Sequence, residues 1–166
     1  MAGLAPAAQA VIAFVKGTVQ PLLAYAAMSA CGNLDDLDAV ITADYVEHAA
    51  LPPGVPTGLA GLKAMMTAYR QAFPDFTIAI EKYLEQGEVG CAVVRMTGTQ
   101  TRAFMGAPAT GRTVDIAGID VARVVDGRCV EHWGVEDDLG LFTQLGLYSI
   151  PQQTPTPIQL PSESRV

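Results

Sequence analysis

The sequence predicts an α+β fold, in which helices from the first half of the chain pack on one face of a curved antiparallel sheet formed by the second half. Two observations predict it. Between Leu59 and Phe73 the apolar residues recur every three or four positions, as they do along one face of a helix. From Phe76 onwards the chain instead contains runs of β-branched residues separated by short connections. Helices followed by consecutive strands are typical of the α+β class.

The first half of the chain contains the expected helices. Proline, glycine and capping residues mark where each helix begins and ends. In order, we expect a short helical piece and a second helix within residues 5–31, a short helix capped by Asp35 or Asp36 that ends near Ile41, an extended segment over 44–48, and the amphipathic helix over 59–73.

The second half contains the expected strands and one last helix. The strands are predicted over 76–84, 90–101, 113–125 and 128–136, and the helix over 139–145. Residues 1–148 are therefore assigned to a single domain, in which residues 1–20 are an N-terminal extension. Residues 149–166 are rich in proline and predict a tail or an arm rather than a second domain.

The composition is that of one folded domain with an acidic surface. The chain has 166 residues, of which 50% are hydrophobic, and a net charge of -7. We expect neither nucleic acid nor an anionic membrane as a partner, because both require a basic face. No apolar run reaches the roughly 18 residues of a membrane span. The three cysteines are widely spaced and form no metal or redox motif, so a reducing, cytoplasmic compartment and no metal are expected.

The stretch after Val114 predicts a hairpin that turns at Asp126-Gly127. Alternation along its second strand places Cys129, Glu131, Trp133, Val135 and Asp137 on one face. A two-residue turn puts Asp120 opposite Trp133. A three-residue loop with Gly127 in a bulge instead pairs Val124 with Arg128, which places Val121 and Ile119 beside the Trp133 face and Asp115 opposite Asp137. We favour the bulge, because it gathers Ile119 and Val121 around Trp133 in one apolar wall.

Several motifs appear in the order found in SnoaL-like polyketide cyclases, and the resemblance spans about residues 25–146. They are Tyr45-Val-Glu-His48, Ala72-Phe-Pro-Asp75, Gly98-Thr-Gln100, the loop from Phe104 to Gly111, Asp126-Gly-Arg128, Glu131-His-Trp133, Asp137 and Gln144-Leu-Gly146. The resemblance implies an α+β cone with an internal pocket, of the ketosteroid-isomerase-like type. It also implies cofactor-free closure of a polyketide ring by intramolecular aldol condensation, with one aspartate as general acid/base. Gln100 departs from the family, in which His is frequent at that position.

Asp137 is the residue that we expect to serve as this acid/base. An aldol closure requires removal of a proton from an acidic carbon and delivery of a proton to a carbonyl oxygen. A carboxyl group in an apolar pocket suits both steps, because burial raises its pKa towards neutrality. The alternative is that Asp137 caps the helix that follows, although Asp138 is better placed for that role.

Other residues are expected around the same pocket. Arg123 and His48 are the candidates to polarise or position the substrate, although Arg123 also suits a surface ion pair with Glu131. His132 alternates away from Trp133 and is expected to be structural. The residues expected to contact substrate are Trp133, Tyr45, Phe104, Met105, Gln100 and Asp115.

The expected function is a cofactor-free cyclase that acts on an apolar, carbonyl-rich small molecule such as a polyketide ester. An epoxide hydrolase or isomerase of the same cone is the enzymatic alternative, in which Asp115, Asp137 and Tyr45 would hold a water. A non-catalytic module for binding or dimerisation is the alternative from another class. An exposed, partly apolar sheet face also predicts a homodimer or tetramer.

Overall fold

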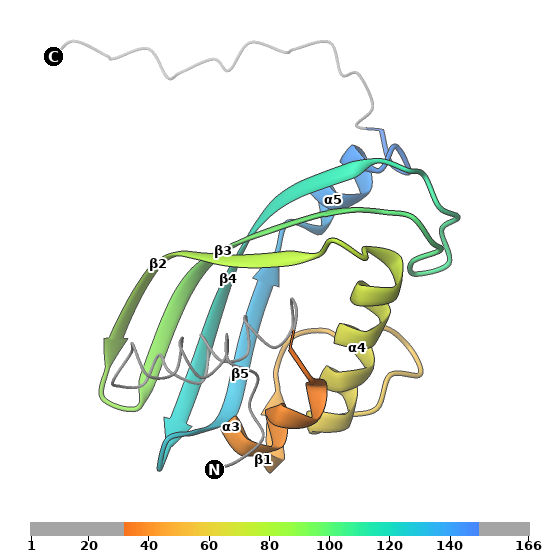
Figure 1. Ribbon diagram of the computed structural model, residues 1–166. Helices are drawn as coiled ribbons and strands as arrows, with labels where there is room; N and C mark the ends of the chain where they lie inside the picture. The colour runs from red at the N-terminus through yellow and green to blue at the C-terminus, as the bar shows by residue number, and fades with distance from the viewer. Residues whose placement is uncertain (1–31, 150–166) are drawn as a thin grey trace, which may run out of the picture.

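The computed structural model describes residues 32–149, which form one curved sheet with helices beside it (Figure 1). In chain order the elements are η1 (Leu34–Asp36), α3 (Leu37–Val40), β1 (Ile41–Glu47), α4 (Gly58–Ala72), β2 (Thr77–Gln86), β3 (Val89–Thr99), β4 (Thr113–Val125), β5 (Arg128–Glu136) and α5 (Asp138–Gln144). The α+β class and the order of helices and strands predicted from the sequence are confirmed. The predicted elements within 5–31 and the predicted tail lie outside the described residues.

The five strands lie in the order β1-β5-β4-β3-β2. Strands β2 to β5 form an antiparallel meander, as expected for strands joined by short connections. Strand β1 pairs with β5 in parallel at the other edge, which the sequence did not predict. Because α4 connects β1 to β2, the chain passes from one edge of the sheet to the other through this helix. Figure 1 shows the sheet curving over α4.

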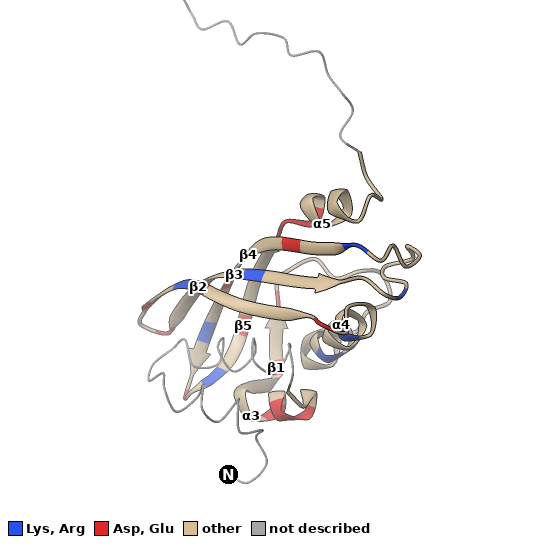
Figure 2. Cartoon of the chain, turned by 45° about the horizontal axis from the view of Figure 1, so that its top comes forward, with Lys and Arg blue, Asp and Glu red and all other residues tan. Residues whose placement is uncertain are grey.

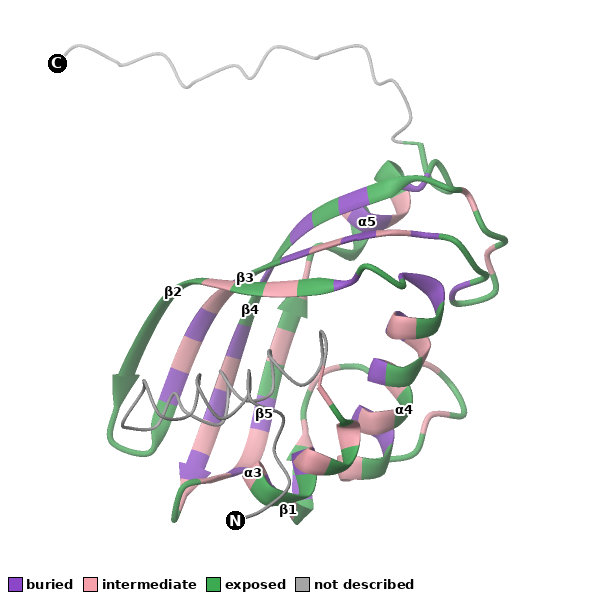
Figure 3. Cartoon of the chain, in the orientation of Figure 1, coloured by how far each residue is buried: buried purple, intermediate pink, exposed green. Residues whose placement is uncertain are grey.

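The core lies between α4 and the concave face of the sheet. Leu62, Met66 and Tyr69 recur at helical spacing along α4 and are all buried. On β4 every second residue is buried, as expected when one face of a strand covers a core (Figure 3). Val114 and Ile116 belong to that buried set. The packing of these side chains against α4 therefore determines which face of the sheet covers the core.

The hairpin between β4 and β5 turns in two residues and contains a bulge further along. Asp126 and Gly127 both have positive φ, of 49° and 74°, as a tight hairpin turn requires. Val125 pairs with Arg128, but beyond Val124 the register shifts by one residue. The extra residue is Val130, so the predicted bulge at Gly127 is wrong, and a bulge lies within the strand instead.

The bulge sets which β5 side chains point inward. Arg123, Val121 and Ile119 share the face of Trp133, as expected, but the favoured register is wrong, because Val125 rather than Val124 pairs with Arg128. The predicted common face of β5 is also wrong, because Cys129 is buried whereas Trp133, in the third pair beyond the bulge, is 39% exposed on the outer face. His132 is buried on the inner face instead.

Candidate functional site

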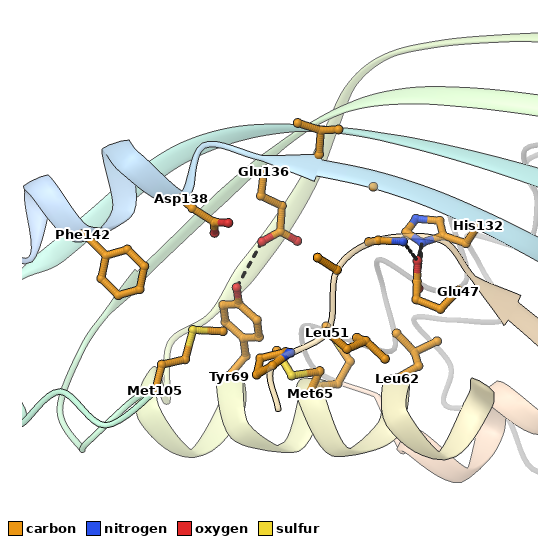
Figure 4. Close-up of a pocket in the computed structure, with 16 residues that line it drawn as sticks. Glu47, Leu51, Leu62, Met65, Tyr69, Met105, His132, Glu136, Asp138 and Phe142 are labelled. Carbon is orange, nitrogen blue, oxygen red and sulfur yellow. Dashed lines mark hydrogen bonds and ion pairs between the residues drawn. The ribbon is translucent and has the colours of Figure 1, made fainter. Parts of the chain in front are cut away.

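A pocket of about 500 Å³ lies between α4 and the C-terminal half of β5 (Figure 4). Its volume falls within the range of small-molecule sites. Its apolar wall comes from α4, from the loop after β1, from the loop between β3 and β4, and from α5. The residues that form this wall are Leu62, Met65, Met66, Leu51, Pro52, Met105 and Phe142.

Strand β5 supplies the polar side of the pocket. His132, Gly134 and Glu136 follow one another at every second position and all line it. Glu47 at the end of β1 and Asp138 at the start of α5 complete the polar lining. Figure 4 shows Glu136 above Tyr69, with the His132–Glu47 pair further along the strand.

Glu136 is a carboxyl group in a largely apolar part of the pocket. Its Oε2 accepts a hydrogen bond from the Tyr69 hydroxyl at 3.1 Å. Burial raises the pKa of Glu136, as do the nearby acids Asp120 and Asp138, and these effects outweigh the opposing hydrogen bond from Tyr69. Burial also raises the pKa of Tyr69, so the phenol remains a donor. A carboxyl group with a raised pKa is suited to proton transfer near neutral pH.

His132 lies between two carboxylates at the other end of the polar side. Its Nδ1 lies 3.0 Å from both oxygens of Glu47, and its Nε2 lies 3.1 Å from Oδ1 of Asp120. Burial opposes the charged imidazolium, but the hydrogen bonds that it donates to Asp120 and Glu47, and the charges of these carboxylates, outweigh burial and raise the pKa of His132 to about 9. His132 is therefore cationic at neutral pH, and the three side chains join β1, β4 and β5.

Tyr45 belongs to the surroundings of this cluster rather than to the pocket surface. Its hydroxyl donates to Oε2 of Glu47, and the backbone N–H of Ala49 donates to Oε1 at 2.9 Å. Burial opposes the ionised Glu47, but the hydrogen bonds from His132, Tyr45 and Ala49 lower its pKa overall. Tyr45 is 4% exposed and does not line the pocket, so the expectation that it contacts substrate directly is corrected.

The expectation that Asp137 lies in the pocket is wrong. Its carboxylate caps α5 by accepting a hydrogen bond from the backbone N–H of Gly140 at 2.8 Å, and the residue is exposed. Asp138 lines the pocket instead. Asp137 therefore caps the helix and Asp138 faces the pocket, which is the reverse of the prediction. The reason is that a capping side chain accepts a hydrogen bond from a backbone N–H in the first turn of the helix, here that of Gly140.

Four further predicted residues lie on the outer face of the sheet or at its rim, away from the pocket. The Trp133 indole stacks on the His48 imidazole with ring centroids 4.4 Å apart. His48 also pairs with Glu131 at 3.1 Å. Arg123 bonds to Glu131 at 2.7 Å, which is the surface ion pair considered as its alternative.

Asp115 is held in an exposed ion pair with Arg95, at 2.6 Å. Figure 2 shows acidic (red) and basic (blue) segments on the neighbouring strands β4 and β3. The three residues required by the epoxide hydrolase alternative are therefore on the outer sheet face (Asp115), at a helix cap (Asp137) and in the core (Tyr45), and they form no common site.

The loop between β3 and β4 contains the other three predicted residues. Met105 lines the pocket, in agreement with its predicted place, and adopts a positive φ of 47°. Phe104 is 3% exposed and packs on Tyr69 with ring centroids 4.7 Å apart, so it is a core residue. Gln100 is fully buried and its amide holds the loop, accepting from Thr110 and donating to the carbonyl of Pro108. Neither Phe104 nor Gln100 lines the pocket.

Sequence reasoning missed the polar residues that the structure brings together. They are Glu47, His132, Glu136 and Asp138 at the pocket surface and Asp120 behind them. The alternation of His132 and Glu136 with Trp133 was visible in the sequence. The prediction failed because it assumed that the indole of Trp133 lies on the inner face of the sheet.

A family model and two curated relatives that match this sequence point to the same family. Residues 20–145 match the family model described as SnoaL-like polyketide cyclase. The chain is 28% identical over 116 residues to the nogalonic acid methyl ester cyclase of Streptomyces nogalater, covering 69% of this chain and 87% of that protein. It is 31% identical over 117 residues to the aklanonic acid methyl ester cyclase of Streptomyces peucetius, covering 69% of this chain and 81% of that protein.

Solved structures agree with the sequence comparisons. The structure of TsrD from Streptomyces laurentii superimposes with a TM-score of 0.72 at 27% identity, covering 81% of this chain and 98% of that one.

The charged state of His132 predicts how stability depends on pH. Since its pKa rises from 6.5 to about 9 on folding, the imidazolium stabilises the fold fully below pH 6.5 and loses this effect as the pH rises through 9. The contribution is at most about 3 kcal/mol. We expect the difference in unfolding free energy between wild type and His132→Gln to shrink steadily between pH 6 and pH 10, measured by urea unfolding.

The control is Thr67→Ala, which changes an exposed side chain of α4 that does not titrate. Its difference from wild type should stay constant over the same range. A wild-type to His132→Gln difference that does not change with pH would contradict the ion cluster.

Proposed function

Because this chain belongs to the SnoaL-like polyketide cyclase family, we propose that it closes a ring in an apolar, carbonyl-rich ester by intramolecular aldol condensation. Two relatives of known name are methyl ester cyclases, which supports an ester as the substrate. The pocket of about 500 Å³ is large enough for a ligand of two or three fused rings.

We assign the acid/base role to Glu136 rather than to Asp137. Glu136 lines the pocket, its pKa is raised by burial and by neighbouring acids, and Tyr69 fixes the orientation of its carboxyl group. This combination of a buried carboxyl group and an apolar wall is the observation that carries the proposal. Asp137, by contrast, is exposed and already accepts a hydrogen bond from Gly140.

The reaction requires three changes of bonding. The Glu136 carboxylate removes a proton from a carbon between two carbonyl groups, which leaves a delocalised enolate. The enolate carbon then attacks a second carbonyl carbon of the same molecule, forming the ring C–C bond. The resulting alkoxide takes the proton back from Glu136, so the group returns to its starting state and the substrate is isomerised without net loss of atoms.

The apolar wall supports this chemistry by excluding water and by orienting the two reacting carbons. Met65, Met66 and Met105 supply flexible side chains that adapt to a flat, ring-forming ligand. Orientation matters because an intramolecular reaction gains rate when its reacting atoms are already close together. Met105 is therefore proposed as a substrate contact.

The assignment is tested by comparing two isosteric substitutions. Glu136→Gln keeps the size of the side chain and a partner for Tyr69 but removes the titrating group, so we expect turnover of aklanonic acid methyl ester to fall by about a hundredfold or more. Asp137→Asn keeps a good helix cap and should remain within a few fold of wild type. Product formation is followed by chromatography under single-turnover conditions.

Thermal unfolding of both variants shows whether they are folded. Turnover by a folded Glu136→Gln at the wild-type rate would contradict the role of Glu136. Ligand binding by the wild type without turnover of aklanonic or nogalonic acid methyl ester would instead favour a binding module.

We also propose that the outer face of the sheet packs on a second copy of the chain. Ile119, Trp133 and Val135 are 49%, 39% and 74% exposed, and they form an apolar centre on this face. Ion pairs flank the centre on two sides, Arg95 with Asp115 and Arg123 with Glu131. Since each flank carries both signs, a two-fold axis through the centre can bring each arginine near an acid of the other copy.

This arrangement predicts a particle of at least twice the chain mass of 17.4 kDa in light scattering. Ile119→Lys places a charge in the apolar centre and should give the mass of a single chain. Leu139→Lys adds the same charge at an exposed position of α5 and should leave the mass unchanged. A single-chain mass for the wild type would contradict the proposal.

A further inference from the structure

Met105 lines the pocket from a strained backbone position. Among the described residues, two other than glycine have a positive φ, Met105 at 47° and Asp126 at 49°, and of these two only Met105 lines the pocket. The left-handed region is unfavourable for a long side chain, whereas Asp adopts it more readily. Met105 is also 46% exposed, so its side chain lies at the mouth, between solvent and the pocket. Backbone strain at a residue that faces a site indicates a role there.

A tight two-residue turn holds Met105 in this conformation. The backbone N–H of Phe104 donates to the carbonyl of Ala107 at 3.0 Å, and the N–H of Ala107 donates to the carbonyl of Phe104 at 2.9 Å. Gly106 has a φ of 81°, so both central residues have positive φ, which is the pattern of a type I′ turn. Such turns prefer the pair Asn-Gly, and this turn departs from that preference only at Met105.

The residues on both sides of the turn are fixed, so a shift of the loop does not relieve the strain. The ring of Phe104 is buried against Tyr69 and Phe73, with ring centroids 4.7 Å and 5.3 Å away. The buried Gln100 amide forms hydrogen bonds with the backbone further along the loop. Met105 can therefore leave the pocket mouth only if a buried ring moves with it.

We propose that Met105 is a specificity-determining residue, which this turn holds over the apolar end of the pocket although its side chain makes the turn less stable. Figure 4 shows Met105 near Phe142 and Tyr69, at the end away from the His132–Glu47 pair. An apolar ring of a ligand is better accommodated at this end than beside the charged pair. The Met105 thioether then adds apolar, polarisable surface against that ring. This inference rests on the proposed function only in taking the pocket as the ligand site.

The substitution Met105→Asn separates binding from stability, because the two should change in opposite directions. It creates the preferred Asn-Gly pair, so we expect the melting temperature of the free protein to rise by about 2–4 °C. It also removes apolar surface from the pocket, so the affinity for methyl 2-naphthoate should fall about fivefold. Melting is followed by circular dichroism without ligand, and affinity by fluorescence titration at pH 7.

The preference for methyl 2-naphthoate over methyl benzoate, which lacks the second ring, tests the specificity. We expect this preference to fall about fivefold in Met105→Asn, because the second ring is the part that Met105 contacts. The affinity for methyl benzoate is measured by competition with methyl 2-naphthoate. Neither ester has a chain that can cyclise, so the result does not depend on turnover, and a failure of the cyclase proposal would be seen separately.

Two further variants serve as controls. Met105→Leu keeps both the strained position and the apolar surface, so it should melt close to the wild type and retain most of the affinity and of the preference. Asp126→Asn changes the same position of the Asp126-Gly127 turn, which also has two positive φ values but lies outside the pocket. This variant should bind both esters as the wild type does.

The inference is overturned if folded Met105→Asn keeps the wild-type affinity and preference, or if it melts below the wild type. It is also overturned if Met105→Leu loses as much affinity as Met105→Asn, because the apolar surface would then not be the determinant. No detectable binding of methyl 2-naphthoate to the wild type up to its solubility limit counts against it in the same way.

Discussion

The contact of the His132 imidazolium with Glu47 and Asp120 is the constraint on which the rest of the site depends. Glu47 ends β1, Asp120 lies in β4, and His132 lies between them in β5, so one cation joins three neighbouring strands. The backbone N–H of His48 also donates to the carbonyl of His132 at 2.9 Å, which continues the parallel pairing just beyond β1. Breaking a buried ion pair by removing one partner typically costs about 3–5 kcal/mol.

The same cluster influences the chemistry of the neighbouring carboxyl group. One imidazolium with two carboxylates has a net negative charge, and Asp120 contributes to the raised pKa of Glu136. Asp120 therefore favours the protonated form of the proposed acid/base, whereas the positive charge of His132 opposes it. Two side chains of the cluster that joins the strands thus also influence the pKa of Glu136.

Much of the fold could be predicted from the sequence, because local patterns determined it. The bounds of β4 and β5 are those expected from their β-branched residues, and the hairpin turns at Asp126-Gly127 as expected, although in two residues rather than in the favoured three-residue loop. The parallel pairing of β1 could not be predicted, because it joins segments more than 80 residues apart. No periodicity within a single strand identifies its partner.

The candidate site could be predicted only in part, for a related reason. Alternation shows which residues share a face but not which face meets the helix. Trp133 was expected to line the pocket, yet α4 lies on the opposite side of the sheet, where His132 and Glu136 point. Met105 lines the pocket whereas its neighbour Phe104 is buried in the core, a difference that the sequence of the loop does not show.

The bulge at Val130 decides which set of side chains the pocket receives. Cys129 lies opposite Val124 on the inner face, and without an extra residue Glu131 and Trp133 would follow it inward. The extra residue Val130 shifts the alternation of inward and outward side chains by one position. His132, Gly134 and Glu136 therefore point inward instead. A bulge of one residue thus turns Glu131 and Trp133 to the outer face and His132 and Glu136 to the pocket. The outer face receives the indole and the ion pairs, which are suited to contact with another protein surface.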